Sequence, residues 1–525
     1  MDIFKYKWFA TGDIGASATI IFDNLTVLAF MSLILTIGYH FPVEIIKNHI
    51  IPGSVMGIIA GNLLCFYLSF KLAKKLNKQV TAVPFGLDAP SAIGISICIV
   101  GPAFTMFQQS GMEVNQAAIM SWHIGIGGLF IIAFIKLFFS LFAEKVKSAI
   151  PQAALLGAIA GVAIALIGFT SLESIFKTPI VGLTVLAIVF LTIFAKVKLP
   201  FNLSSIPVAI IVGTVLYYIL IPFKLSGSMP NLTGSFNFIF PIPSLAFIKD
   251  FNHIIAYIPV VIPFALLVIF GSMAVAESSA SMNENYKIRD LIIIDSISTF
   301  IIALCGGISQ TTPYAGFPAY KKLDARAGYL LINVIVVGVG GLCGLVAFLV
   351  NIIPEAALGP VLLFVAFEIA SQGFIQCDKK FTVAILFALF PSLARLLAIK
   401  FTNGSLIEVG KLQSLCFLNC SSGISDTLAI IMLGNGFIIT GTLWGALLCF
   451  AISKKWNESV SCALLLSIFS YFGVIHSIYI TGKMYIPYNL PEDVKHIPLE
   501  VSLGYIAVAI IIFILSKFRN QINLD

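Results

Sequence analysis

Charged residues are scarce in this sequence. Asp, Glu, Lys and Arg make up 10% of its 525 residues, whereas apolar residues make up 59%. A soluble protein of this size needs far more charge to cover its surface, so the composition excludes a soluble globular fold. Apolar runs of about 20 residues recur from end to end, and each is long enough to cross a bilayer. The sequence therefore predicts an integral membrane protein with many spans.

Other missing features exclude further classes. The nine cysteines are scattered singly, which argues against a disulfide framework or a metal cluster. The six histidines are dispersed, and no His-Glu-x-x-His motif occurs, so neither a metal nor a catalytic constellation is expected. No phosphate-binding loop of the G-x-x-x-x-G-K-[ST] kind is present, which excludes direct ATP drive and leaves no predicted cofactor. The N-terminus lacks the pattern of a cleavable signal, so the first span is expected to be an uncleaved anchor.

Sixteen spans are predicted, of which the third and tenth are broken by Pro and Gly. They lie near 14–38, 49–70, 83–105, 117–141, 149–170, 178–197, 205–223, 254–277, 286–305, 311–323, 327–352, 357–374, 380–399, 427–452, 457–481 and 500–517. With the N-terminus inside, the inner segments hold 21 Lys and Arg and the outer segments nine, which accounts for the net charge of +7 better than nucleic-acid binding does. Lys136 lies within the fourth span, near enough to its inner end to reach the headgroups. We expect both termini in the cytoplasm and a location in a bacterial inner (plasma) membrane.

Two span starts resemble each other. Residues 150–157 read "IPQAALLG" and residues 353–359 read "IPEAALG", and they open the fifth and twelfth spans. Because seven spans separate them, the two copies enter the membrane from opposite sides. This predicts an inverted repeat of seven plus seven spans, which is typical of secondary transporters. An ordinary helix start with Pro in its first turn is the alternative.

The broken third and tenth spans hold the same place in each half. They read "TAVPFGLDAPSAIG" at 81–94 and "GISQTTPYAGFP" at 307–318. Backbone that is not helical is tolerated at membrane depth only when it is buried in protein or lines a cavity, so paired breaks predict a solute site. Hydrogen-bonding residues cluster at the second break: Gln310, Thr311, Thr312 and Tyr314. A role in turn formation alone is the alternative for them.

Acids within the spans mark a candidate ion or substrate path, because burying them is costly. Asp23 lies near the middle of the first span, beside Asn24, and Asp295 lies in the ninth span. Glu277, in "MAVAESSASMN", ends the apolar run of the eighth span, and its alternative is a helix-end carboxylate at headgroup level. Asp88, at the first break, is either a site residue or the N-cap of the helix that follows, and both roles are compatible.

These motifs together resemble the nucleobase–cation symporter family of xanthine, uracil and purine permeases. The stretch "VPFGLDAPSA" is similar to the "APGMGLNAYF" type of segment in the adenine/guanine/hypoxanthine branch. "IIIDSISTFIIALCGGISQTTPYAG" resembles the family's ninth span and its Thr-rich break. The resemblance covers roughly residues 12–450. It departs from the family at Ala315 and Gly316, where a Glu or a Gln-Asn pair is usual.

The resemblance implies a fourteen-helix fold with a core domain (12–141 and 254–352) and a gate domain (149–223 and 353–452), and two extra C-terminal helices follow at 457–517. It further implies short β-strands in spans three and ten, with a nucleobase bound between them, and it is compatible with a homodimer. The residues it implies are Glu277, Phe85, Gly86, Asp88, Gln310, Thr311, Thr312, Tyr314 and Asn24 for the base, and Glu277, Asp23 and Asp295 for proton coupling.

The predicted function is secondary active transport of a nucleobase with protons, in which the core domain carries the solute past the gate. The first alternative is an anion transporter of the same inverted-repeat fold. It requires cations near the breaks, and the closest in sequence, Lys321 and Lys322, follow the second break. The second alternative is a membrane-embedded enzyme, which the dispersed histidines disfavour.

Overall fold

The apolar runs form helices in a computed structural model of the protein. The structure describes residues 5–142, 151–197, 199, 205–227, 229, 238–314, 316–404, 413–414, 417 and 424–522. Within these ranges, ten helices are long and apolar enough to cross a membrane, or eleven if one bent pair counts as a single span. The prediction of an all-α protein with many membrane spans is confirmed. Wider π-type turns continue several helices without a break, so that Ala89–Gln109, for example, is one span.

The chain folds as two compact units. The first comprises Met1–Ala143, Ser171–Ile254 and Phe264–Leu363, and the second comprises Glu144–Thr170, Ile255–Pro263 and Phe364–Asp525. Two long helices, α13 (Ile258–Ser281) and α19 (Glu355–Gln376), belong partly to each unit. The division into core and gate domains expected from the sequence follows other boundaries, and it stays a prediction.

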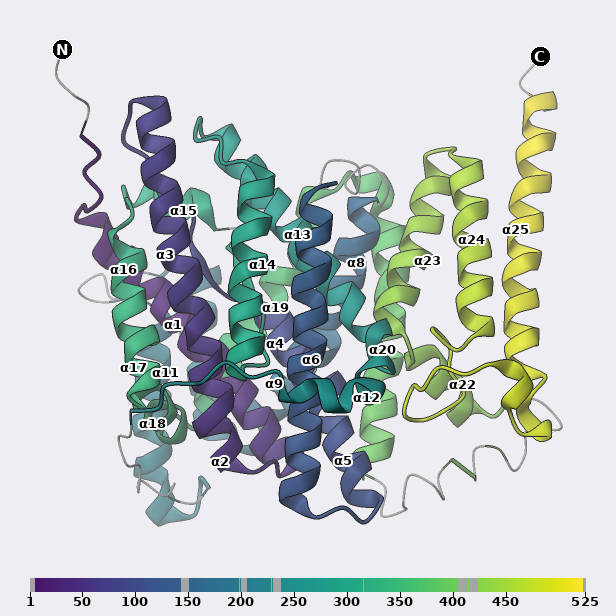
Figure 1. Ribbon diagram of the computed structural model, residues 1–525, viewed down its shortest axis with the longest axis horizontal. Helices are drawn as coiled ribbons and strands as arrows, with labels where there is room; N and C mark the ends of the chain where they lie inside the picture. The colour runs from purple at the N-terminus through teal and green to yellow at the C-terminus, as the bar shows by residue number, and fades with distance from the viewer. Residues whose placement is uncertain are drawn as a thin grey trace. The chain divides into compact units, whose positions relative to one another are not determined.

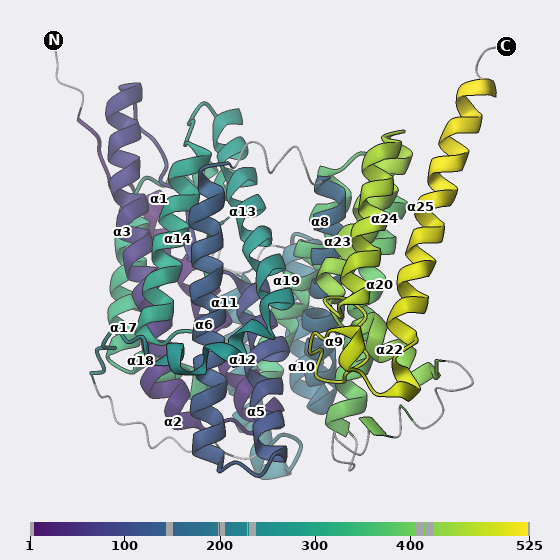
Figure 2. The same cartoon turned by 45° about the vertical axis from the view of Figure 1, so that its right-hand side comes forward.

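A row of three long helices organises the first unit. Helix α14 packs between α3 and α6 (Figures 1 and 2). Gly57 of α3 makes the first of these contacts close, since a Cβ there would run into Ile302 and the backbone of Ser298 on α14. The helices of this unit are α1 (Gly12–Leu33), α2 (Val43–Ile45), α3 (Ile51–Leu76), α4 (Ala89–Ile95), α5 (Gly101–Gln109), α6 (Val114–Ser140), α9 (Phe169–Lys177), α10 (Pro179–Val189), α11 (Ser205–Leu220), α12 (Phe251–Ile255), α14 (Ile288–Cys305), α15 (Phe317–Lys322), α16 (Gly328–Asn333), α17 (Gly340–Leu342) and α18 (Leu345–Ile352).

The second unit packs around three helices, α8 (Gln152–Val162), α20 (Thr382–Gly404) and α23 (Phe437–Ile452), which contact one another in pairs. Small residues let them approach, because a Cβ on Gly445 would meet Ala154 and Ala388. Helix α24 (Trp456–Tyr471) packs against both α23 and α25 (Ile497–Ile522). Helices α24 and α25 are the additional C-terminal pair that the sequence predicted.

Two of the predicted C-terminal spans differ from the helices observed. The predicted span 427–452 is two helices, α22 (Asp426–Gly434) and α23, bent by 81°. The bend occurs where Gly436 has a φ of +68° and the Asn435 side chain donates hydrogen bonds to the carbonyls of Ser477 and Tyr479. The predicted span 457–481 ends early, at Tyr471, and irregular chain follows it up to α25.

The two similar span starts adopt the same local structure. Pro151 precedes α8 and Pro354 precedes α19, and in each case the proline carbonyl accepts a 3.0 Å hydrogen bond from the alanine three residues on, Ala154 or Ala357. The prediction of an inverted-repeat transporter fold with short strands in the two breaks is confirmed by the fold comparison below and by an antiparallel strand pair that joins the breaks.

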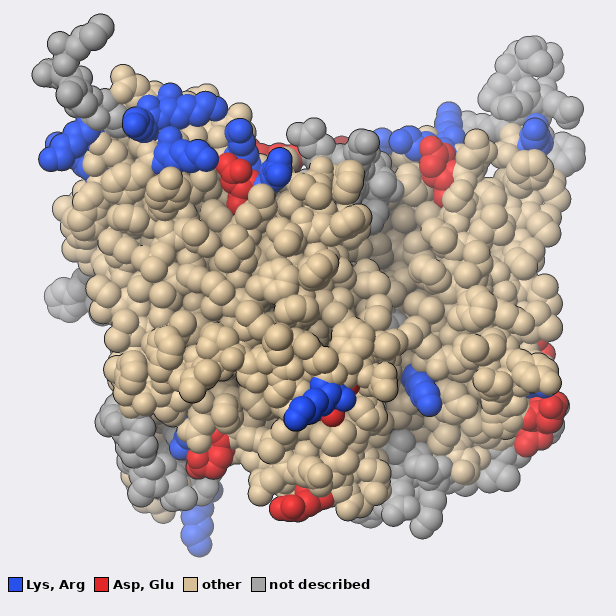
Figure 3. All heavy atoms as spheres, viewed as in Figure 1, with Lys and Arg blue, Asp and Glu red and all other residues tan. Residues whose placement is uncertain are grey.

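Charge is distributed along the first unit as in a membrane protein. A cluster of Lys and Arg side chains lies at the end that carries the N-terminus, a broad belt of mostly uncharged side chains follows, and further charged side chains lie beyond the belt (Figure 3). Lys71, Lys74 and Lys75 at the end of α3 are exposed in this cationic region. The pattern agrees with an integral membrane protein, and the cytoplasmic assignment of this end stays a prediction.

Candidate functional site

The two breaks meet as a pair of short strands in the first unit. β1 (Phe85–Leu87) and β2 (Thr311–Pro313) are antiparallel, with Phe85 opposite Pro313, Gly86 opposite Thr312 and Leu87 opposite Thr311. The prolines and glycines around them prevent helix formation, and pairing gives the freed backbone groups partners at membrane depth. The predicted convergence of the third and tenth spans is thus observed in the geometry.

Side chains from neighbouring helices complete this pairing. Asn24 of α1 accepts a 2.9 Å hydrogen bond from the Leu87 N–H, and Asn62 of α3 donates a 3.0 Å bond to the Phe85 carbonyl. The Tyr314 hydroxyl donates to the Leu87 carbonyl over 3.1 Å. Both asparagines are fully buried. The predicted site residues Asn24, Phe85 and Tyr314 are therefore brought together, and their described contacts hold the strands in place.

Gly86 lies in the most crowded part of the pair. A Cβ at this position would collide with the Tyr314 hydroxyl and with Oδ1 of Asn24. Glycine is therefore required here by the close approach of two side chains, one from each half of the chain.

Asp88 and Gln310 join the ends of the strands. The Asp88 N–H donates a 2.9 Å bond to the Gln310 carbonyl, and the Asp88 carboxylate accepts a 2.9 Å bond from the Ser91 N–H. The carboxylate is thus the N-cap of α4, one of the two roles expected for it. The Gln310 amide donates to the carbonyl of Phe264 over 3.0 Å, and its Oε1 is buried with no hydrogen-bond partner among the described residues.

A buried ion pair lies directly against β2. Nζ of Lys136, on α6, is 3.0 Å from Oδ2 of Asp295, on α14, and both side chains are fully buried. These two atoms are close but not aligned as a hydrogen bond. The same ammonium donates to the Thr299 hydroxyl over 3.1 Å and to the Thr311 carbonyl of β2 over 3.3 Å. The Thr311 hydroxyl in turn donates to Oδ1 of Asp295 over 3.0 Å.

Lys136 corrects an expectation from the sequence. Its side chain does not reach the headgroups; it turns inward to an acid on a neighbouring helix, Asp295. Lys136 and Asn62 are the site residues that the sequence did not identify. The signal for Lys136 was a lysine within an apolar span, which is costly unless an acid on a neighbouring span pairs with it.

The remaining predicted residues lie further from the strands or are less enclosed. Thr312 and Asp23 are half-buried. Glu277 lies within α13, about 9 Å of helix rise beyond Gly271, the residue of α13 that faces Thr312. Its side chain is exposed, so the expectation of a buried acid is wrong here, and α13 continues past it to Ser281. Ala315 lies outside the described residues.

The strand pair carries a buried ammonium on one side. A half-helix capped by its own carboxylate, Asp88, adjoins it. The described residues contain no group of three or more His, Cys, Asp and Glu side chains that could hold a metal ion.

Comparison with known proteins identifies the fold. No protein-family model matches the sequence, and no curated protein matches it. The transmembrane domain of the bicarbonate transporter BicA from a cyanobacterium matches with a TM-score of 0.53 and 14% identity, over 74% of this chain and 96% of that one. The structure of SLC26A9 matches with a TM-score of 0.55 and 14% identity, over 74% of this chain and 63% of that one. At this identity the likeness shows the fold alone.

These matches overturn the family suggested by the motifs. The two solved structures described above are a bicarbonate transporter and SLC26A9, and neither is a nucleobase permease. The assignment to the nucleobase–cation symporters is wrong, and so is the nucleobase–proton function that rested on it. The fold is that of a membrane transporter, as the inverted repeat predicted.

Proposed function

We propose that this chain is a secondary transporter of a small anion, with its transport site at the β1–β2 pair. The observation that carries the proposal is the buried ammonium of Lys136, 3.3 Å from the Thr311 carbonyl. A fully buried lysine in a membrane span is rare and marks an ion or substrate path more often than not. The ammonium can attract an anion to the strands, and the sequences of the two breaks alone could not reveal this cation.

The fold comparison supports the same class of solute. The cyanobacterial match is named as a bicarbonate transporter, which makes bicarbonate and related small anions the first candidates for this chain. The argument against an anion was that neither break contains a cation in sequence. A lysine from another span fills that role, because α6 and α14 pack against each other and place Lys136 beside β2.

The neighbours of Lys136 suit a site whose charge must be shared. Asp295 stabilises the ammonium when no anion is bound, and the Thr311 hydroxyl holds one oxygen of that carboxylate in place. In the empty state Asp295 compensates the charge of the ammonium, so no buried charge is left unpaired. An anion beside β2 would compete with Asp295 for the ammonium. In this proposal the core (12–141 and 254–352) moves past the gate (149–223 and 353–452), and this movement exposes the site to each side of the membrane in turn.

The test is uptake into proteoliposomes that contain the purified chain. Radiolabelled bicarbonate, chloride and sulfate are supplied in parallel with uracil and xanthine. We expect saturable uptake of at least one anion and none of the bases above empty vesicles. Lys136→Met should lower anion uptake at least tenfold, whereas Lys74→Met, which removes an exposed lysine on α3, should not change it. Uptake of a base without any anion would reject the proposal.

A further inference from the structure

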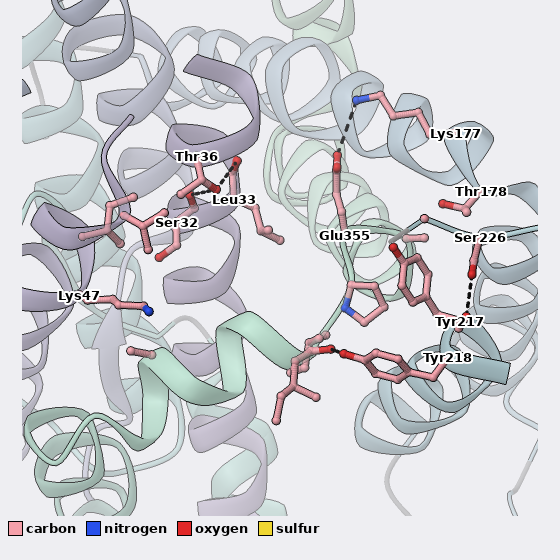
Figure 4. A pocket seen from close by; sticks show the side chains of 18 of the residues that line it. Ser32, Leu33, Thr36, Lys47, Lys177, Thr178, Tyr217, Tyr218, Ser226 and Glu355 are labelled. Atoms are coloured by element: carbon pink, nitrogen blue, oxygen red, sulfur yellow. Dashed lines mark hydrogen bonds and ion pairs between the residues drawn. The ribbon is translucent and has the colours of Figure 1, made fainter. Parts of the chain in front are cut away.

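A cavity of about 580 Å³ lies in the first unit, at the C-terminal end of α1 (Figure 4). Its walls come from several helical segments, among them the ends of α1 and α9 and the start of α19, and no residue of the two breaks lines it. The volume is within the range of about 300–1,000 Å³ that is usual for sites of small organic ligands. The transport site proposed above does not account for this space.

The charge around the cavity is mostly positive. Among the described residues that line it, three are lysines, Lys47, Lys177 and Lys224, and one is an acid, Glu355. A concave surface with an excess of one charge raises the local concentration of ions of the other sign. All three lysines belong to segments that the sequence predicts on the outer side of the membrane, so the cavity would collect anions from the outer side.

One position for an anionic group, beside Lys177, is occupied by the carboxylate of Glu355. Glu355 is the first residue of α19, and its carboxylate lies 4.0 Å from Nζ of Lys177 (Figure 4). A helix N-terminus favours negative charge, which explains the position of the carboxylate. The Lys177 side chain is 55% exposed and that of Glu355 27%. Such an open ion pair is worth at most about 1 kcal/mol, so an incoming carboxylate can replace Glu355.

A second place lies across the cavity. Figure 4 shows Lys47 on the side away from Lys177, with its ammonium directed into the space between them. Lys47 is half-buried, and no ion pair joins it to another described residue. Apolar side chains, among them Leu33 and Ile353, and hydroxyl groups, among them that of Thr36, line the rest of the wall. The cavity therefore offers two cationic sides joined by a wall of mixed polarity.

We propose that this cavity binds a small organic dianion, a dicarboxylate of a few carbon atoms, with one carboxylate at Lys177 and the other at Lys47. The short carbon chain of such a ligand would lie against the apolar and hydroxyl-bearing side chains that line the cavity. This second anion site goes beyond the proposed transport function, and binding there does not depend on transport at the strands.

Calorimetric titration of the purified full-length chain in detergent tests the site. Succinate is the probe, with propionate as the comparator that has one carboxylate and succinamide as the neutral one. We expect succinate to bind, propionate to bind at least tenfold more weakly and succinamide not to bind. Lys47→Met and Lys177→Met should each weaken succinate binding at least tenfold. Lys249→Met, an exposed lysine of the same unit that does not line the cavity, is the matched control.

Glu355→Gln separates loss of binding from loss of folding. Removing the competing carboxylate should tighten succinate binding about threefold, and a misfolded variant cannot bind more tightly. The proposal is overturned if the wild type does not bind succinate, or if Lys47→Met and Lys177→Met both bind it as the wild type does. Succinate binding without uptake of any anion would instead reject the proposed function and leave this site standing.

Discussion

The buried pair of Lys136 and Asp295 yields the sharpest prediction. Lys136→Met keeps the volume of the side chain but leaves the Asp295 carboxylate at 0% exposure without its cation. Breaking a buried pair by removing one partner costs about 3–5 kcal/mol. Asp295→Asn leaves the buried ammonium without its anion and should cost a similar amount of stability. The double variant has no buried charge, and we expect its stability to return to within about 1 kcal/mol of the wild type.

The two single variants and the double variant form a cycle. If each single change costs about 3 kcal/mol and the double change about 1 kcal/mol, the coupling energy between the two side chains is about 5 kcal/mol. Denaturant titration in detergent micelles measures these free energies of unfolding. Anion uptake by the same three proteins in vesicles then separates folding from transport.

The informative protein is the double variant. We expect it to regain stability but not uptake, because the anion has lost the ammonium beside β2. Uptake restored to the wild-type rate would show that the pair only stabilises the fold, and the proposed role of Lys136 would be refuted. Single variants whose stability differs from the wild type by less than about 0.5 kcal/mol, as is usual for surface substitutions, would show that the two side chains are not a buried pair in the membrane.

Three further predictions concern Asp88 and Gly86, at the strands, and Asp13, in the first turn of α1. Asp88→Asn keeps the N-cap and removes a negative charge, so the KM for anion uptake should fall by up to about tenfold, since two negative charges about 10 Å apart repel each other by on the order of 1.5 kcal/mol at an effective dielectric constant of 20. A rise in KM would contradict the anion assignment. Gly86→Ala should abolish uptake and destabilise the protein by about 1–3 kcal/mol, because its methyl group displaces Tyr314, as uptake and unfolding measurements on one preparation can show. Asp13→Ala should lower the free energy of unfolding by about 3 kcal/mol without changing the KM of the folded fraction, because the fully buried carboxylate accepts three backbone N–H groups; an unchanged unfolding midpoint would refute this.

The architecture could be predicted because membrane constraints appear directly in the sequence. Apolar length predicts the spans, and the Pro and Gly residues between 84 and 90 and between 306 and 318 mark where two spans are interrupted. Two breaks in matching positions must satisfy their backbone groups within the protein, and pairing with each other is the solution observed. The repeat of Pro before two Ala-rich helix starts carried the same information.

The substrate could not be predicted from those motifs, for a related reason. The stretch around Phe85 and Gly86 reflects what a break in a membrane helix needs, namely a tight turn, a short strand and a cap such as Asp88. Transporters of unrelated solutes that share this fold meet the same requirement. Similarity of "VPFGLDAPSA" to a nucleobase permease segment therefore tracked the fold and gave the wrong solute class.

The pairing of Lys136 with Asp295 was missed because it depends on packing. Lys136 and Asp295 are far apart in the sequence, and only the contact between α6 and α14 shows that they pair. The same holds for Asn62, whose amide reaches Phe85 from α3. Glu277 shows the opposite error, since an acid after an apolar run was expected to be buried and its side chain is exposed.

The strand pair also has a consequence for biosynthesis. Gly86 leaves the ribosome long before its partner Thr312, which belongs to the other half of the chain. At about 5–20 residues per second, roughly 10–45 s pass before the second strand is synthesised. During that interval Asn24 and Asn62 can already contact Leu87 and Phe85, but the backbone groups of the first break that pair with β2 have no partner. Insertion of this chain therefore requires a protected, hydrated waiting place, such as the translocation channel, until the second half arrives.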